Sequence, residues 1–219
     1  MVFQNPDDQL VATLVEDDVA FGPENLGVES AQIAQRVREA LKGVGLVGFE
    51  RHETHALSGG QKQRVALAGV LAMEPRVLIL DEASSMLDPR GRKGLMKVCH
   101  ALHERGMTIV MITHFMEEAA EADRVAVFRA GHVAMLGTPE EILTRADELA
   151  QLNLDMPASC RLGRSLRAKG VPVCAQVREA DMVAEIAQAY AEWSGADIAG
   201  QPSASDSHVI TMDPLQPTG

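Results

Sequence analysis

Two neighbouring segments constrain the fold of this chain more than any other feature: residues 57–64 (LSGGQKQR) and residues 77–82 (VLILDE). The first places two glycines at the start of a predicted helix, and the second is an apolar run that ends in two carboxylates. Free N–H groups at a helix N-terminus favour a phosphate, and carboxylates at a strand end can hold its metal and the attacking water. Together the segments predict a phosphate site.

The first segment predicts a helix whose N-terminus is open to an anion. Gly59 and Gly60 carry no Cβ that would keep phosphate oxygens away, and Ser58 can cap the helix and donate its hydroxyl. Apolar residues at helical spacing extend the pattern to about Met73, and Pro75 closes it. Alone, Ser-Gly-Gly would be interpreted as an ordinary loop sequence. The strand segment that follows favours a phosphate site instead.

Residues 76–80 predict a strand, because the continuous apolar run after Arg76 is typical of a parallel strand covered on both faces. Ligand-binding side chains follow the carboxyl ends of such strands. We therefore expect Asp81 to hold Mg²⁺, directly or through water, and Glu82 to orient or deprotonate the attacking water. The alternative is a solvated acidic pair that ends a strand.

Five motifs now stand in order: Gln4 in VFQNPDDQ, residues 57–61 (LSGGQ), residues 77–82, residues 85–88 (SMLD) and Thr113-His114. In this order they resemble the Q-loop, signature, Walker B, D-loop and switch histidine of ABC transporter ATPases. The segment VFQNPD at residues 2–7, followed by DVAFGPENL at residues 18–26, is most similar to the ATPases of energy-coupling factor transporters. That family imports vitamins and transition-metal ions.

The resemblance implies an α/β fold: an incomplete P-loop NTPase fold of the ABC ATPase type, with a mostly parallel sheet, an inserted helical subdomain and a small carboxy-terminal helical extension. We divide the chain into the Q-loop, the helical subdomain with the signature motif, the remainder of the nucleotide-binding core, a dimerisation extension and a flexible tail. Their ranges are 1–9, 10–74, 75–149, 150–193 and 194–219.

The resemblance also implies roles for single residues, with ATP and Mg²⁺ as cofactors. Gln4 would contact the Mg²⁺ and report to a membrane partner, and His114 would contact the γ-phosphate beside Glu82. Asp88 would lie at the interface with a second ATPase subunit. The residues that would bind that subunit's nucleotide in trans are Ser58, Gly59, Gly60 and Gln61.

One family motif is missing from the sequence. A phosphate-binding loop reads G-x-x-x-x-G-K-[ST], and no Gly-Lys dipeptide occurs in the 219 residues. In the family this loop and its strand precede the Q-loop, and we expect that strand to lie beside the strand of residues 76–80. We interpret the chain as amino-terminally truncated, inactive on its own and poorly soluble. The alternative is a non-hydrolytic protein that donates its signature motif to an intact partner.

Composition limits the partners. The net charge is −11 without a basic cluster, which argues against a nucleic-acid surface. No apolar run approaches the roughly 18 residues needed to cross a bilayer. The resemblance therefore implies a peripheral protein on the cytoplasmic face of a bacterial or archaeal membrane. Its partners would be a second ATPase in a homo- or heterodimer, a transmembrane coupling subunit and a substrate-binding membrane subunit.

Hydrophobic periodicity and turn residues predict the remaining elements. We expect helices over 10–21, 30–44, 90–105, 115–122 and 181–193, strands over 107–113, 124–128 and 133–136, and a capped helix from Thr138. The helix over 181–193 carries Tyr190 and Trp193, and we expect its apolar side chains to pack into a core. Cys99, Cys160 and Cys174 are widely spaced, which indicates reduced thiols.

Overall fold

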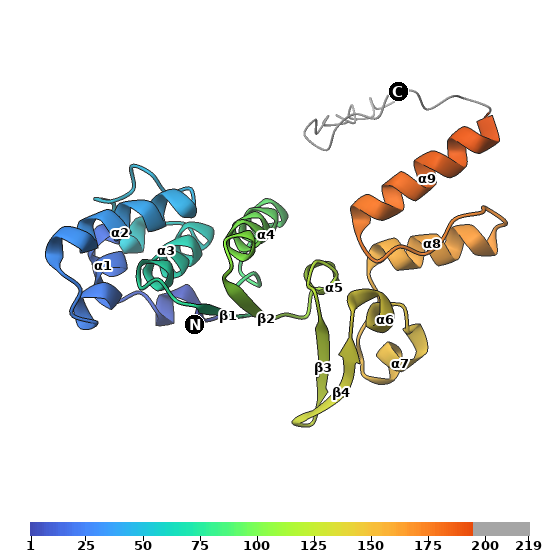
Figure 1. The fold of residues 1–219 in the computed structure, drawn as a ribbon, viewed down its shortest axis with the longest axis horizontal. Helices are drawn as coiled ribbons and strands as arrows, with labels where there is room; N and C mark the ends of the chain where they lie inside the picture. Colours follow the sequence, from blue (N-terminus) through green and yellow to red (C-terminus); the bar gives the residue numbers. More distant parts are fainter. Residues whose placement is uncertain (195–219) are drawn as a thin grey trace, which may run out of the picture.

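The computed structural model describes residues 1–194, so the tail predicted for 194–219 lies outside the described residues except for Ser194 (Figure 1). Chain order runs from helices into a short parallel sheet, then a hairpin and further helices. The helices are α1 (Val15–Asn25), α2 (Ser30–Gly43), α3 (Gly59–Ala72), α4 (Pro89–Glu104), α5 (Met116–Ala119), α6 (Pro139–Leu143), α7 (Ala146–Gln151), α8 (Ala158–Ala168) and α9 (Glu179–Ser194). The strands are β1 (Val77–Asp81), β2 (Thr108–Ile112), β3 (Val125–Arg129) and β4 (His132–Gly137), and the 3-10 turns are Pro6–Asp8 and Thr54–Ala56.

Helices α1, α2 and α3 pack on one another and share a core with β1 and α4. The expected helix over residues 10–21 is wrong at both ends, because α1 starts at Val15 and continues through Pro23 to Asn25. The buried carboxylate of Asp18 accounts for the late start. It accepts hydrogen bonds from the N–H groups of Val11 (2.7 Å) and Ala12 (3.0 Å), which holds that segment out of the helix.

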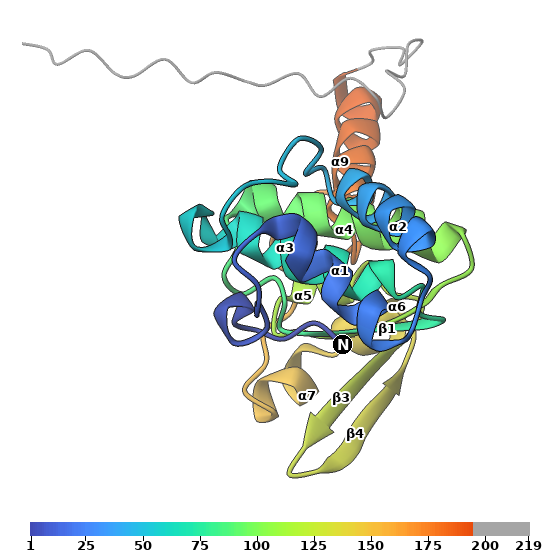
Figure 2. The same cartoon turned by 90° about the vertical axis from the view of Figure 1, so that its left-hand side faces the viewer.

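The parallel sheet is covered on one face, whereas the sequence predicted cover on both. Leu78 and Leu80 of β1 are almost fully buried in the core shared with α3 and α4. On the opposite face Val77, Val110 and Ile112 keep 48%, 45% and 48% exposure. The run of apolar letters identified the strand correctly, but it could not show which faces have neighbours. Figure 2 shows α2, α3 and α4 on one side of β1, with the β3–β4 hairpin pointing away from them.

Strand β1 has a neighbour on each edge. It pairs in parallel with β2 from Val77↔Thr108 to Asp81↔Ile112, and Val2 forms a parallel bridge to Leu80 on the other side. A further strand beside β1, as the resemblance implied, has no place there. Within residues 1–194 it is β2 that has a single strand partner, so an added strand would pair with β2.

The hairpin and its helix confirm the turn chemistry read from the sequence. Strands β3 and β4 are antiparallel, and Ala130 (φ 48°) and Gly131 (φ 81°) make the tight turn between them. Thr138 caps α6 in a reciprocal capping box with Glu141. These elements, with α7 and α8, share a second apolar core that includes Leu143, Leu149 and Cys160.

The carboxy-terminal helices α8 and α9 pack against each other, but not as fully as the sequence predicted. Met182 is buried as expected. Tyr190 is 63% exposed and Trp193 is 82% exposed, so the packing predicted for these two aromatics is wrong within the described chain. No helix in residues 1–194 is long and apolar enough to cross a membrane.

Candidate nucleotide site

The carboxyl ends of β1 and β2 bring together three residues that are far apart in the sequence. The amide Nε2 of Gln4 donates a 2.8 Å hydrogen bond to Oε2 of Glu82. The ring Nδ1 of His114 lies 3.7 Å from Oε1 of the same carboxylate. Glu82 therefore has an amide on one oxygen and an imidazole near the other. The family resemblance implied that His114 lies beside Glu82, whereas the hydrogen bond from Gln4 to Glu82 was not predicted.

The backbone of Glu82 is unusual for a residue with a side chain. Its φ is 47°, in the left-handed region, and its N–H donates to the carbonyl of Ile112 at 2.9 Å. A residue other than glycine in this region costs of order 1 kcal/mol or more, and such residues cluster at active sites. The bend turns the chain sharply after β1. No sequence pattern predicted this backbone conformation of Glu82.

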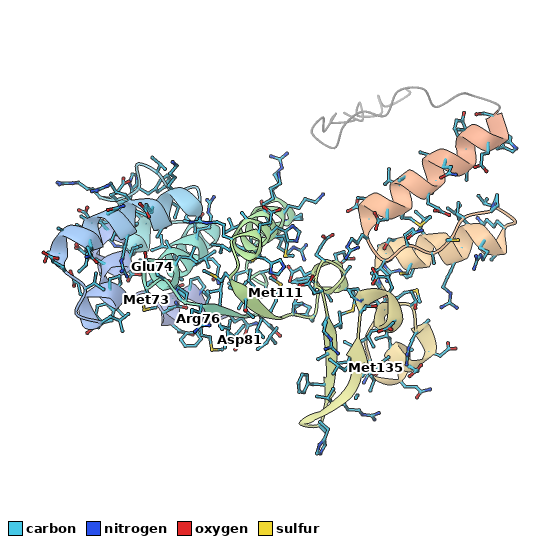
Figure 3. All side chains as sticks on the ribbon, in the orientation of Figure 1. Met73, Glu74, Arg76, Asp81, Met111 and Met135 are labelled. Carbon is cyan, nitrogen blue, oxygen red and sulfur yellow. The ribbon has the colours of Figure 1, made fainter. Side chains whose placement is uncertain are left out.

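Asp81 is the last residue of β1, and Figure 3 labels it there, with Met111 on the neighbouring strand. Its side chain is half-buried, and its N–H donates to the carbonyl of Val2 at 2.9 Å. Because Gln4 uses its amide nitrogen on Glu82, its amide oxygen is left as an acceptor. An aspartate and an amide oxygen suit Mg²⁺, which usually takes one or two protein ligands and completes its shell with phosphates and water.

No group of three or more His, Cys, Asp or Glu side chains in residues 1–194 could hold a metal by itself. The Asp81 carboxylate and the Gln4 amide are oxygen donors of the kind that Mg²⁺ takes beside phosphates.

The signature residues lie at the exposed N-terminus of α3. Ser58 caps the helix in a reciprocal box: Ser58 Oγ accepts from the Gln61 N–H at 3.3 Å, and Gln61 Oε1 accepts from the Ser58 N–H at 2.8 Å. Gly59 is exposed and Gly60 half-buried. The predicted cap and helix start are confirmed. We call these four residues, Ser58, Gly59, Gly60 and Gln61, the signature surface. No hydrogen bond in the described chain joins them to Gln4, Glu82 and His114, which we call the Glu82 cluster.

Asp88 caps α4, which begins at Pro89. Its Oδ1 accepts a 2.6 Å hydrogen bond from the N–H of Gly91. A cavity of about 570 Å³ separates the start of α4 from α3, with Ser58, Gly60 and Asp88 on its wall. The signature and D-loop residues therefore share one side of the molecule.

Sequence reasoning missed the contacts that tie the Q-loop to α3. Lys62 Nζ lies 2.6 Å from Oδ1 of Asp7, and Gln63 Nε2 donates to the carbonyl of Phe3 at 3.1 Å. Phe3 directly precedes Gln4, so the buried Gln63 holds the peptide that sets the position of Gln4. Lys62 and Gln63 follow the signature residues in the sequence, but no local pattern predicts that they bond to Asp7 and Phe3.

Contacts of the switch histidine were missed as well. The rings of His114 and Phe115 are tilted against each other with centroids 4.2 Å apart, and the Arg92 guanidinium lies 4.1 Å from the centre of the Phe115 ring. Thr113 Oγ1 donates a 2.6 Å hydrogen bond to Oε2 of Glu118, a carboxylate that is 6% exposed.

Comparison with known proteins identifies the family of this chain. The chain is 53% identical over 186 residues to the energy-coupling factor transporter ATP-binding protein of Symbiobacterium thermophilum, covering 84% of this chain and 65% of that protein. It is 50% identical over 190 residues to the protein of that name in Clostridioides difficile, covering 86% of this chain and 69% of the relative. This chain belongs to the energy-coupling factor ATP-binding protein family.

Solved structures of the wider group confirm the fold class of this energy-coupling factor protein. CbiO1 of Clostridium perfringens, described as part of the ABC transporter complex CbiONQ, matches with a TM-score of 0.63 and 39% identity, over 76% of this chain and 66% of that structure. A bacterial ABC transporter cassette, described as dimeric, matches with a TM-score of 0.56 and 27% identity, over 64% of this chain and 62% of that structure. Residues 1–85 match the family profile described as ABC transporter. The fold is that of an ABC-type P-loop NTPase, and the chain spans 65% of the length of the Symbiobacterium relative.

Proposed function

We propose that this energy-coupling factor protein is the ATP-binding and ATP-hydrolysing subunit that energises an importer of vitamins or transition-metal ions. One observation carries the proposal furthest: Gln4 and His114 converge on the Glu82 carboxylate at the strand ends, in a chain about half identical to transporter ATP-binding proteins.

In this proposal each residue at the strand ends has a separate task. Asp81 and the amide oxygen of Gln4 hold Mg²⁺, which, when bound, neutralises charge on the phosphate oxygens. Glu82 accepts a proton from the attacking water or orients that water. Its 2.8 Å hydrogen bond to Gln4 fixes the carboxylate in one position. His114 contacts the γ-phosphate from the other side of Glu82.

The signature residues act on a different nucleotide. Ser58, Gly59, Gly60 and Gln61 present the exposed N-terminus of α3, which is suited to phosphate oxygens held by a second ATPase subunit. Asp88, on the same side of the molecule, contacts that subunit. The two sets of residues lie on different elements: the signature residues are at the start of α3, and Glu82 directly follows β1.

Exposed apolar residues on α9 support a second ATPase as partner. Val183, Tyr190 and Trp193 are 61%, 63% and 82% exposed, and they recur at intervals of seven and three residues. Such spacing on a helix forms a stripe that pairs with another helix. We propose that α8 and α9 join the two ATPases, and that this pair binds the transmembrane coupling and substrate-binding subunits at the cytoplasmic face of the membrane.

A second candidate is a non-hydrolytic protein that lends its signature surface to an intact ATPase. The sequence favours it in one respect, because no stretch of the 219 residues matches G-x-x-x-x-G-K-[ST]. That loop positions the β- and γ-phosphates and supplies a lysine, so its own site would lack both positioning and charge.

MgATP binding and hydrolysis by this chain alone distinguish the two candidates. We expect negligible hydrolysis from these 219 residues, since they contain no G-x-x-x-x-G-K-[ST] loop. That result fits both candidates, so the deciding result is hydrolysis by the chain alone. If hydrolysis is observed and is lost in Glu82→Gln, the chain's own site is complete and the first candidate holds for this chain as it stands. Hydrolysis that survives Glu82→Gln would contradict the proposed role of Glu82.

A further inference from the structure

Phe115 occupies a position that its side chain does not suit. It is the N-cap residue of α5, where Ser, Thr, Asp and Asn are preferred, and its side chain makes no capping hydrogen bond. The Phe115 N–H instead donates to Oγ1 of Thr113 at 3.0 Å. When a residue breaks a local rule, the reason usually lies in what its side chain contacts.

The Phe115 ring contacts two other groups. It lies against the His114 ring in a tilted arrangement, with ring centroids 4.2 Å apart and an interplanar angle of 37°. The Arg92 guanidinium carbon lies 4.1 Å from the centroid of the Phe115 ring, within the range of a cation–π contact. The order of contact is therefore Arg92, Phe115, His114.

His114 needs such a neighbour to keep one orientation. Its side chain is 57% exposed at the end of β2, so little else restricts the rotation of the ring. Glu82 Oε1 lies 3.7 Å from Nδ1, which defines one direction. The Phe115 ring, in contact with the imidazole, limits its rotation.

The same contacts reach the start of α4. Arg92 lies in the first turn of this helix, and its N–H donates to the carbonyl of Asp88 at 2.9 Å. Asp88 is the helix cap and, in the proposed function, a contact to the second subunit. A shift at Asp88 would therefore move Arg92 and, through Phe115, the His114 ring.

We propose that Phe115 and Arg92 are positioning residues that fix the His114 ring toward Glu82 and couple its orientation to the D-loop end of α4. The task assigned to His114 rests on the proposed function. The orientation of its ring does not, so it can be tested without nucleotide.

The test is an NMR spectrum of the full chain with ¹⁵N- and ¹³C-labelled histidines, in which His114→Asn identifies the His114 ring signals. An imidazole held against the Phe115 ring has its carbon-bound protons shifted upfield relative to those of the exposed His132. We expect Phe115→Leu to abolish this upfield shift and Phe115→Tyr to keep it. Arg92→Ala should reduce the shift, and Arg92→Lys should keep more of it than Arg92→Ala does.

Lys93→Ala is the matched control, because Lys93 is the next residue of α4 and is exposed. Thermal unfolding of each variant checks that the fold is kept. If Phe115→Leu does not fold, the His114 proton shifts of Arg92→Ala and Lys93→Ala can still be compared to test the proposal. Unchanged His114 signals in Phe115→Leu, or equal effects of Arg92→Ala and Lys93→Ala, would overturn the proposal. If these spectra support the contacts but this chain mixed with an intact family ATPase shows no ATP hydrolysis, the positioning contacts remain valid and the proposed function is refuted.

Discussion

At the scale of single residues, the buried carboxylate of Asp18 holds the loop ahead of α1. It is 8% exposed and accepts two backbone hydrogen bonds. Asp18→Ala leaves both N–H groups without their partner, so we expect the free energy of unfolding to fall by about 2 to 3 kcal/mol. Urea unfolding followed by circular dichroism measures it. Asp17→Ala is the control, because Asp17 is the exposed neighbour in the same helix. Equal losses in the two variants would refute the assignment.

The three thiols should differ in reactivity. Burial, with a smaller contribution from the nearby Glu118, raises the pKa of Cys99 from 9.0 to about 12. Burial also raises the pKa of Cys160, whereas Cys174 is exposed. Because the thiolate is the reactive form, we expect a thiol reagent at pH 8 to modify Cys174 first and Cys99 only after unfolding. Rapid modification of Cys99 in the folded chain would contradict its burial.

The same pKa shift predicts a stability change with pH. The pKa of Cys99 is higher folded than unfolded, so its contribution is complete below pH 9 and is lost as the pH rises toward 12. The loss is about 1.4 kcal/mol per pH unit in that window. Cys99→Ala should flatten the alkaline limb of a stability–pH curve. An identical slope in both proteins would contradict the shift.

Residue identity predicted most of the candidate site but not its geometry. The motif order singled out Gln4, Glu82 and His114, and the structure brings them together. The positive φ of Glu82 could not be predicted, because glutamate rarely adopts it and a tertiary bond to Ile112 stabilises it. Phe115 was missed for a similar reason, since its partner Arg92 lies 23 positions earlier and no local pattern joins them.

At the scale of helices, two glycines give opposite expectations for the same substitution. A Cβ on Gly163 of α8 would lie 2.7 Å from the Cα of Ala175, whereas one on Gly94 of α4 meets nothing within 4 Å. We expect Gly163→Ala to force α8 from the neighbouring segment and lower the free energy of unfolding by about 1 to 3 kcal/mol.

Gly94→Ala should be neutral or stabilising by up to about 1 kcal/mol, because alanine favours the helix. Denaturant unfolding of both variants provides the comparison. A Gly163→Ala protein as stable as Gly94→Ala would show that α8 does not pack as described.

Element boundaries were predictable where a local signal exists. Ser58 and Thr138 were predicted as caps, and each caps its helix. The start of α1 was not predictable, because Asp18 bonds to residues seven and six positions earlier rather than within one helical turn.

At the scale of the whole molecule, the uncovered face of the parallel sheet should dominate solution behaviour. Val77, Val110 and Ile112 are each about half exposed on it, and Met1 and Phe3 are exposed nearby in the segment that bridges to β1. Apolar surface beside an open strand edge promotes association. We expect the isolated chain to bind a hydrophobic dye and to scatter light.

Replacing Val110 and Ile112 with Thr should reduce both signals while keeping strand-compatible side chains. The control is the double change Val133→Thr with Leu136→Thr, which removes exposed apolar groups from the hairpin. If the control reduces association equally, the open face is not its cause. The sequence predicted a strand covered on both faces because a run of apolar residues indicates burial. It does not show which elements cover each face.

The most direct test of the central claim, that this chain is one half of an ATPase pair, is a complementation assay. A family ATPase with an intact phosphate loop but an arginine in place of its own signature serine is mixed with this chain. We expect little hydrolysis from either protein alone, hydrolysis in the mixture, and none when this chain carries Ser58→Arg. A folded, associated mixture without hydrolysis, or hydrolysis unaffected by Ser58→Arg, would contradict the claim.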